Sequence, residues 1–273
     1  MKNYEELTIK DDFMFSKVMS RPDLCKEMIE LLLDIEVEKV EKVEREYGFA
    51  PLIDKHSIRL DVYVKNSDKI FDIEIQTTNE HNLELRARYY QSLMDIDEFE
   101  KSMDYNELKE TFIVFICTFD PFGDGFLKYD VQQAILDEDG TILANYDDST
   151  HKIFYNLKSK ELNESNSKVN KFLRYLATNK VEGDLASKVD LAFKDAKSYN
   201  AWRLEYMILQ EKLDSEYKKG LKEGEIATKN AVVLNMLNSS LSIDEISKYT
   251  GLTKEYILEV KEKLKLFFLI IKE

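Results

Sequence analysis

Three polar residues on two neighbouring segments, Asp61, Glu74 and Gln76, have the types and spacing that could do chemistry. They lie in the stretch 58–77, IRLDVYVKNSDKIFDIEIQT, in which apolar and polar residues alternate on both sides of a polar turn. This alternation predicts the two strands of a hairpin, because successive side chains of a strand point to opposite faces. A turn centred on Ser67-Asp68 sets a register that places Asp61 directly opposite Glu74.

This register brings two like charges together. Cβ atoms directly opposite each other on one sheet face lie roughly 5 Å apart, where like charges destabilise the pair. A divalent cation between the carboxylates of Asp61 and Glu74 would remove the repulsion, since Mg²⁺ takes oxygen ligands. The alternative is an exposed sheet face, on which water and Arg59, predicted opposite Gln76, screen the charges. The spacing alone leaves both interpretations open.

The composition is that of a globular protein with a large core. The chain has 273 residues, 44% of them apolar, so a main domain and a smaller one are expected. Eight Gly and three Pro indicate few long loops and much helix. The net charge of −14 argues against nucleic-acid binding over the whole surface, because such binding needs cations that displace counterions. A locally basic groove is still compatible with this charge.

The sequence lacks the patterns of a secreted, membrane or nucleotide-binding protein. Cys25 and Cys117 do not suggest a disulfide framework, and the N-terminal segment has no signal-peptide pattern. The longest apolar run, 266–271, is far shorter than the ~20 residues that span a bilayer. No glycine-rich phosphate loop and no zinc-ligand spacing occur, so neither a nucleotide cofactor nor zinc is expected. We therefore expect a cytoplasmic protein that does not bind membranes.

Hydrophobic periodicity predicts helices and strands in an alternating order. A helical pattern over 9–33 breaks near Arg21-Pro22, and a Val-rich stretch over 35–49 favours a strand. After the hairpin, 82–102 is helical, and the nearly continuous apolar run 111–119 predicts a strand covered on both faces. The remaining predicted elements are two short strands and three helices: 129–136, 141–145, 165–180, 184–198 and 200–228.

This order indicates an α/β fold with a mixed sheet, followed by a helical extension. We predict a core over 1–155, a helical extension over 156–230 and a small helix-turn-helix-like unit over 231–273. The last unit begins with a helix over 231–238, and a capping box at Ser242–Glu245 starts the next one. Its basic and acidic residues balance, whereas a DNA reader concentrates cations on one face. A homo-oligomer formed through the C-terminal helices is therefore favoured at least as much as DNA reading.

The arrangement Asp61-x12-Glu74-x-Gln76 resembles the PD-(D/E)XK nuclease motif, with Gln in place of the usual Lys. The resemblance extends along most of the chain. The segments KDDFMFSKVM, RLDVYV, FDIEIQ, LRARYYQSLMD, TFIVFICTFDPF and SIDEISKYTGLTKEYI resemble, in order, the Rpn family. That family comprises recombination-promoting nucleases, which are also described as PD-(D/E)XK family transposases.

The resemblance implies a restriction-endonuclease-like core and a magnesium-dependent DNA endonuclease linked to recombination or mobile elements. It implies that Asp61 and Glu74 are catalytic metal ligands for Mg²⁺, or alternatively Mn²⁺. The backbone carbonyl of Ile75 would add a third ligand, and Gln76 takes the third catalytic place. DNA is the implied partner.

Gln76 is the departure from the family pattern. A lysine would place a positive charge beside the attacking water, whereas Gln76 can orient that water by hydrogen bonding but adds no charge. Arg59 is the predicted replacement for the charge, and a structural partner for Asp61 is its alternative role. The departure supports a second interpretation, in which the chain is a weak or inactive nuclease-fold protein that binds DNA or another protein.

Further carboxylates are weaker candidates for the site. Glu30, on the helix before the first strand, could approach the metal, but a solvated helix face suits it as well. Asp12 lies in the family-like opening segment, and a capping role at a helix start is equally compatible. Asp72 shares the polar strand face with Glu74, and we expect it to be solvated at the sheet edge.

Substrate contacts are predicted on the helix after the hairpin. Arg86, Arg88, Tyr89 and Gln91 combine cations, an aromatic ring and an amide close to the predicted site. Arginines there would suit phosphate binding, although exposed helix arginines are common. The most basic stretch, 158–180, is a second candidate for a DNA-facing element, with a solvated helix as its alternative.

Overall fold

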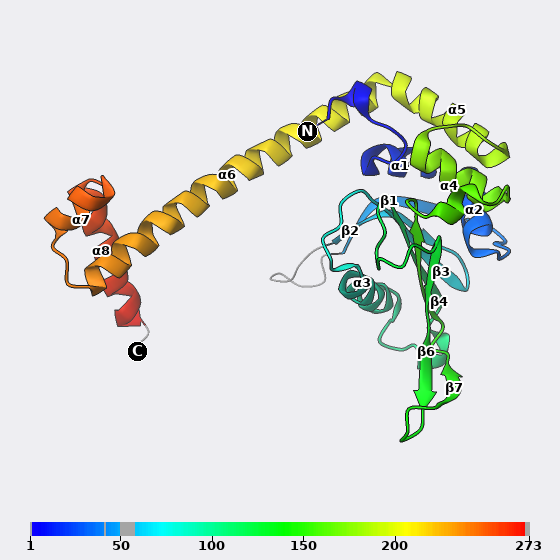
Figure 1. Cartoon of the computed structure of the whole chain (residues 1–273), viewed down its shortest axis with the longest axis horizontal. Helices are drawn as coiled ribbons and strands as arrows, with labels where there is room; N and C mark the ends of the chain where they lie inside the picture. The colour runs from blue at the N-terminus through cyan, green and yellow to red at the C-terminus, as the bar shows by residue number, and fades with distance from the viewer. Residues whose placement is uncertain (1, 41, 50–57, 271–273) are drawn as a thin grey trace. The chain divides into compact units, whose positions relative to one another are not determined.

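The computed structural model describes residues 2–40, 42–49 and 58–270, with side chains over 2–40 and 61–263. The chain divides into two compact units, Met1–Tyr206 and Met207–Glu273. The first unit contains a six-stranded mixed sheet with helices on both faces (Figure 1). The predicted α/β class with a helical C-terminal region is therefore confirmed.

The sheet positions the motif residues on two adjacent strands near its centre. Its strands are, in spatial order, β1 (Lys42–Phe49), β2 (Ile58–Lys65), β3 (Lys69–Gln76), β4 (Glu110–Cys117), β8 (Thr150–Asn156) and β5 (Lys128–Val131). β1, β2 and β3 are antiparallel, whereas β3, β4 and β8 run parallel to one another. β3 thus lies where the antiparallel part of the sheet meets the parallel part.

The predicted hairpin register is confirmed. Val62 pairs with Ile73 and Lys65 with Ile70, as the turn centred on Ser67-Asp68 requires. Asn66 closes the turn, because its backbone N–H donates to Lys69 O at 3.0 Å and its side-chain oxygen accepts from two backbone N–H groups. An Asx residue at this place satisfies the turn without a glycine.

Strand β4 is buried almost along its whole length, as its continuous apolar run predicts. β8, which lies beside it, is absent from the prediction. Its sequence, THKIFYN, begins with three partly exposed residues, and only the second half is buried. The first strand also differs from its expectation, since β1 starts at Lys42 rather than at 35.

Helices cover the two sheet faces. α1 (Asp12–Met19) and α2 (Pro22–Leu33) pack on one face, and α3 (Leu83–Glu98) packs on the other (Figure 1). The predicted break near Arg21-Pro22 is confirmed, because Pro22 is the first residue of α2, where its missing N–H costs no helical bond. The side chains of Tyr63, Ala87 and Phe115 form part of the core under α3.

The helices after 155 belong to the first unit as far as Tyr206. α4 (Lys168–Thr178) and α5 (Asp184–Ser198) pack on α2, and α5 also packs on α1. The structure therefore joins part of the predicted 156–230 extension to the core. A separate two-stranded ribbon, β6 (Gln133–Leu136) with β7 (Ile142–Tyr146), and three 3-10 helices complete the unit: η1 (Tyr4–Glu6), η2 (Tyr105–Glu107) and η3 (Lys160–Asn163).

In the described part of the second unit, all regular elements are helices. It contains most of α6 (Asn200–Asn238), which continues through the gap predicted before 231, and also α7 (Ile243–Thr250) and α8 (Lys254–Ile270). The predicted capping box is present, since Ser242 Oγ accepts from Glu245 N and the Glu245 carboxylate accepts from Ser242 N. None of the helices in the described part of the chain is long and apolar enough to cross a membrane.

Candidate active site

The two predicted metal ligands meet where β2 and β3 stop pairing. The ladder between these strands ends at the pair Val62 and Ile73. Beyond it, Asp61 N donates to Glu74 Oε1 at 3.0 Å, and Ile75 N donates to Asp61 Oδ2 at 3.1 Å. Each carboxylate thus accepts a backbone N–H of the opposite strand. The acidic groups replace the next rung of the sheet, which holds them side by side.

The parallel partner explains why the strands part at this place. β3 stays in register with β4 along its full length, from Lys69 opposite Glu110 to Gln76 opposite Cys117. Because β3 continues with β4 while β2 leaves it, one edge of β3 opens at Glu74 and Gln76. Asp61 is 7% exposed and Glu74 is 2% exposed, so two carboxylates are withdrawn from bulk water here.

A cleft of about 330 Å³ opens at this edge. It is lined by residues from α1, β2, β3, the following loop and α3: Asp12, Asp61, Glu74, Ile75, Gln76, Thr77, Thr78, Glu80 and Arg86. Four of these side chains are carboxylic acids and one is a cation. The cleft is therefore acidic, which favours a bound metal ion and opposes an uncompensated phosphate.

Arg86 is the cation of the cleft. Its Nη1 donates to Gln76 Oε1 at 2.7 Å, and its Nη2 lies 3.4 Å from Glu74 Oε2. Both Nε and Nη2 donate to the hydroxyl of Tyr90, one turn further along α3. Burial disfavours the charged form, but the bonds to Tyr90 and the charge of Glu74 raise the pKa of Arg86 above its ordinary value. The side chain therefore stays charged.

The Tyr90 hydroxyl does not supply a base at neutral pH. Burial and the neighbouring Glu74 carboxylate raise the pKa of Tyr90 to about 12. Burial likewise raises the pKa of the Cys117 thiol, at the end of β4, to about 12. Both groups remain protonated near pH 7, so neither Tyr90 nor Cys117 is suited to nucleophilic catalysis.

Asp72 is fully buried, which corrects the expectation of a solvated side chain. Neither of its carboxylate oxygens has a hydrogen-bond partner. It points into the core under α3, on the same strand face as Glu74, because that face is covered rather than exposed. Burial and then the charge of Asp61 raise the pKa of Asp72 well above its ordinary value.

The donor set at the strand edge fits a magnesium ion. Within the described side chains, no group of three or more Asp, Glu, His or Cys residues is placed to hold a metal. Mg²⁺ does not need such a group, because it keeps several waters and is bound by one or two carboxylates together with substrate phosphates. Asp61 and Glu74 would supply the carboxylates, and the carbonyl of Ile75 is available beside them.

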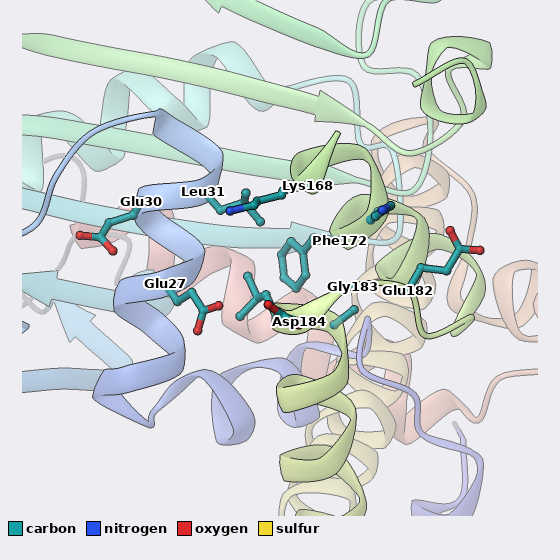
Figure 2. Close-up of a pocket in the computed structure, with 11 residues that line it drawn as sticks. Glu27, Glu30, Leu31, Lys168, Phe172, Glu182, Gly183 and Asp184 are labelled. Carbon is teal, nitrogen blue, oxygen red and sulfur yellow. The ribbon is translucent and has the colours of Figure 1, made fainter. Parts of the chain in front are cut away.

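The weaker carboxylate candidates, Asp12 and Glu30, lie at different places in the structure. Asp12 lines the cleft from the first turn of α1, where its Oδ1 accepts from Phe13 N at 2.8 Å. Glu30 lies elsewhere, on α2, and its carboxylate accepts from Val37 N at 3.0 Å and pairs with Lys26. Figure 2 shows Glu30 beside a different pocket, with its carboxylate pointing away from Phe172. Glu30 is therefore not among the residues that line the cleft.

The remaining predicted contact residues lie in different surroundings. Gln91 is buried and bonds Thr111 and Asp95, so it supports the fold rather than facing a substrate. Arg88 is exposed on α3, and Tyr89 is partly buried against the core under that helix. The side chain of Arg59 lies outside the described residues.

Glu80 is the acidic residue of the cleft that sequence reasoning missed. It follows β3 in the loop that leads to α3, together with Thr77 and Thr78. No periodicity marks a loop residue, so only its distance of six residues from Glu74 signals its place near the site. The structure adds it to the acidic wall of the cleft.

Comparison with known proteins identifies a family. A family model described as PD-(D/E)XK nuclease family transposase matches residues 9–224. That range includes the hairpin, the cleft and α3. No curated protein and no solved structure matches the chain.

Proposed function

Because the chain belongs to the PD-(D/E)XK nuclease family transposases, we propose that it is a magnesium-dependent endonuclease that hydrolyses phosphodiester bonds of DNA. The observation that carries the proposal is the reciprocal bonding of Asp61 and Glu74 across the strand edge. Two carboxylates held at one place, with an open cleft beside them, are what a metal-assisted hydrolysis requires. A role in recombination or in mobile elements belongs to the same proposal.

The residues of the cleft have different proposed roles. Asp61 and Glu74 would hold the metal, and the Ile75 carbonyl would add a ligand; Mn²⁺ could replace Mg²⁺. When bound, the ion would polarise the phosphate and lower the pKa of a water molecule. Gln76 would orient the attacking water through its amide. Asp12 and Glu80 add negative charge to the cleft, which strengthens the attraction for a cation.

DNA must reach this cleft although the protein carries a net charge of −14. Arg88, exposed on α3, is the proposed phosphate contact beside the cleft. The basic stretch 158–180 contributes less than its composition indicates, because Arg174 donates to two backbone carbonyls, of Leu162 and Ser165, and pairs with Glu182. The proposal keeps the expected cytoplasmic location.

The test is plasmid nicking with and without Mg²⁺, for the full-length chain and two isosteric variants. Asp61→Asn and Glu74→Gln each remove one anionic ligand while they keep the side-chain shape. Both are expected to lose metal-dependent nicking and to retain the fold by circular dichroism. Glu84→Gln, on the exposed side of α3, is the matched control and should cut like the wild type. Undiminished nicking by both site variants would contradict the assignment.

The alternative function is a nuclease-fold protein that binds DNA or a partner without cutting. The observation in its favour is Gln76, which brings no charge to the third motif place. Calorimetric titration with Mg²⁺ or Mn²⁺ separates the two proposals. A module that only binds DNA has no need of either ion, whereas the endonuclease must bind one at Asp61 and Glu74.

We also propose that two copies associate through the C-terminal helices, specifically through α6. All residues of α6 between 211 and 229 are exposed. A groove of about 660 Å³ runs along this segment beside Gly220 and Gly224, and its wall is mainly apolar. A Cβ atom at either glycine would meet nothing within 4 Å. Because each glycine costs a helix about 1 kcal/mol relative to alanine, their presence suits a second helix that approaches closely.

The pattern favours antiparallel pairing of the two copies of α6. Apolar and small residues recur on one face at spacings of three and four, which is the seam of a helix pair. About a midpoint at Lys222, large residues of one copy would face small residues of the other in two pairs, Leu213 with Ala231 and Tyr217 with Ala227. Between these pairs Gly220 of one copy would face Gly224 of the other. A parallel pair would instead place Tyr217 of one copy against Tyr217 of the other.

A further inference from the structure

Arg86 is bound more tightly to the protein than a phosphate-binding side chain should be. Its Nε, Nη1 and Nη2 atoms each donate to a protein oxygen. The guanidinium lies 5.4 Å from the ring centre of Tyr90 and 5.5 Å from that of Phe115. The side chain is 24% exposed. The two rings and the hydrogen bonds fix its plane, so it is not free to follow a substrate.

This fixed cation determines which way the amide of Gln76 points. An amide has one end that accepts and one that donates, and a guanidinium can only donate. Arg86 Nη1 therefore selects the Oε1 end of Gln76, at 2.7 Å. The donor end is left toward the carboxylate, and Gln76 Nε2 lies 3.0 Å from Glu74 Oε2. If Gln76 were reversed, its oxygen would face Glu74 and its N–H groups would face a cation.

The same contacts give Arg86 a second effect, which is electrostatic. Among the described residues that line the cleft it is the one cation, against the carboxylates of Asp12, Asp61, Glu74 and Glu80. Its Nη2 lies 3.4 Å from Glu74 Oε2. A charge at this distance inside a partly buried site acts far more strongly than one in water. It opposes the excess negative charge that a phosphate brings to an acidic cleft.

We propose that Arg86 is a positioning residue of this site, which fixes the Gln76 amide toward Glu74 and supplies from α3 the positive charge that the third motif place lacks. This inference rests on the proposed endonuclease function. It assigns the charge to a helix residue that reaches across to β3. It also replaces the expectation that Arg86 binds substrate directly.

The test uses the full-length chain and three variants, Arg86→Gln, Arg86→Lys and the double variant Arg86→Gln with Gln76→Lys. Two quantities are measured for each: kcat and KM for plasmid nicking with Mg²⁺, and Mn²⁺ affinity by calorimetry. Circular dichroism shows that each variant is folded. Arg21→Gln, an exposed arginine at the start of α2, is the matched control and should leave all values unchanged.

Arg86→Gln is expected to lower kcat about 100-fold, as loss of one preorganised donor does, with KM changed by less than about threefold. Mn²⁺ affinity should rise about three- to tenfold in the same variant, because a cation next to Glu74 is gone. Damage to the fold would lower both values, so the opposite signs are diagnostic. Arg86→Lys keeps the charge without the planar pair of donors and should lose about tenfold in kcat.

The double variant decides whether the charge matters at this place. A lysine at position 76 returns a cation beside Glu74, so kcat should recover at least tenfold over Arg86→Gln, and Mn²⁺ affinity should fall back. A double variant no faster than Arg86→Gln would overturn the charge assignment. Unchanged kcat with a raised KM in Arg86→Gln would overturn positioning and restore substrate binding.

Failure of the proposed function gives a different result. If the wild-type chain binds Mn²⁺ but never nicks DNA, the proposed endonuclease function is rejected. The Mn²⁺ affinities of the variants would still decide the role of Arg86. Equal Mn²⁺ affinity in wild type and Arg86→Gln would then reject it. A wild-type chain that binds no Mn²⁺ at all would overturn both.

Discussion

The edge of strand β3 buries acidic side chains, whereas the middle of helix α6 exposes large apolar ones. At the edge of β3, the carboxylates of Asp61 and Glu74 are 7% and 2% exposed. In α6, Tyr217 is 67% exposed and Leu221 is 51% exposed. Burial of a carboxylate and exposure of a large apolar group both cost free energy relative to the reverse. Each is therefore expected where something outside the folded chain, a cation in one case and a second helix in the other, compensates.

The two regions differ in how far the chain itself already compensates the cost. Asp61 and Glu74 accept backbone N–H groups, and Arg86 adds a charge, so the strand site is largely prepared before any ligand arrives. The exposed part of α6 has no comparable support within residues 211–229. An isolated helix of this length with two glycines is marginal in water. We infer that the strand site is preorganised, whereas α6 depends on its partner.

The largest expected effect concerns α6. Gly224→Leu places a bulky side chain in the groove and should weaken self-association at least tenfold, since the helices can no longer approach closely. The same change favours the helix by roughly 1 kcal/mol, because leucine is the better helix former. Sedimentation equilibrium measures the association constant.

Lys222→Leu is the control for this change, because it adds the same side chain to the opposite face of α6. It should leave the association constant of the seam unchanged. A wild-type chain that stays monomeric at all accessible concentrations would contradict the proposed pairing of α6. The exposed apolar residues of α6 would then need no partner helix.

Asp72 offers the next effect in size. Asp72→Val replaces a buried carboxyl without hydrogen-bond partners by a residue that suits a strand interior. We expect the free energy of unfolding to rise by about 1–3 kcal/mol, the usual cost of an unsatisfied buried polar group. Urea denaturation monitored by fluorescence of Trp202 measures it.

A loss of stability in this variant would show that Asp72 has a compensating partner in solution, such as a trapped water. Val114→Asp, the reverse exchange at a buried position on β4, is the matched control and should destabilise the fold severely. Together the two variants would show how much free energy of unfolding a buried carboxyl group costs on each of these two strands.

The smallest effect is expected at Glu98, a carboxylate at the end of α3 that does have partners. Burial alone would raise the pKa of Glu98, but hydrogen bonds from Lys109 and Lys65 lower it below its ordinary value. A lowered pKa means that folding favours the ionised form. The stabilisation is therefore complete above the ordinary value of 4.5 and is lost as the pH falls through the lower folded value.

Glu98→Gln should accordingly lower the free energy of unfolding by up to about 1 kcal/mol at pH 7. Near pH 3 the difference from the wild type should shrink, because the wild-type carboxylate begins to take up its proton. Denaturation curves at the two pH values measure this. An equal difference at both would mean that packing of Glu98, rather than its charge, carries the contribution.

Local patterns were sufficient to predict the hairpin and its register. Strict alternation limits the pairings to those that keep the apolar residues on one face, and the position of the polar turn selects one of them. Val62 opposite Ile73 confirms that pairing. The helix break at Pro22 and the capping box at Ser242 depend on chemistry within a few residues, so they were predictable as well.

Contacts between distant segments were not predictable in this way. The polar face of β3 suggested solvent at Asp72, but α3 covers that face, and nothing in the alternation of one strand shows which side a helix will take. Arg86 was placed on the correct helix, yet its bonds to Gln76 depend on how α3 crosses the sheet. Glu80 lies in a loop, where no period applies.

The separation of β2 from β3 also determines at which stage of synthesis the chain can form its cleft. Residues 58–77 contain Asp61, Glu74 and Gln76, but β3 is held straight by β4, which is synthesised more than thirty residues later. A nascent chain that ends before Glu110 therefore contains every motif residue but lacks β4. Without β4, the carboxylates of Asp61 and Glu74 are not yet shielded from solvent. On the ribosome, the ability to hold a metal ion should appear only after Cys117 has emerged.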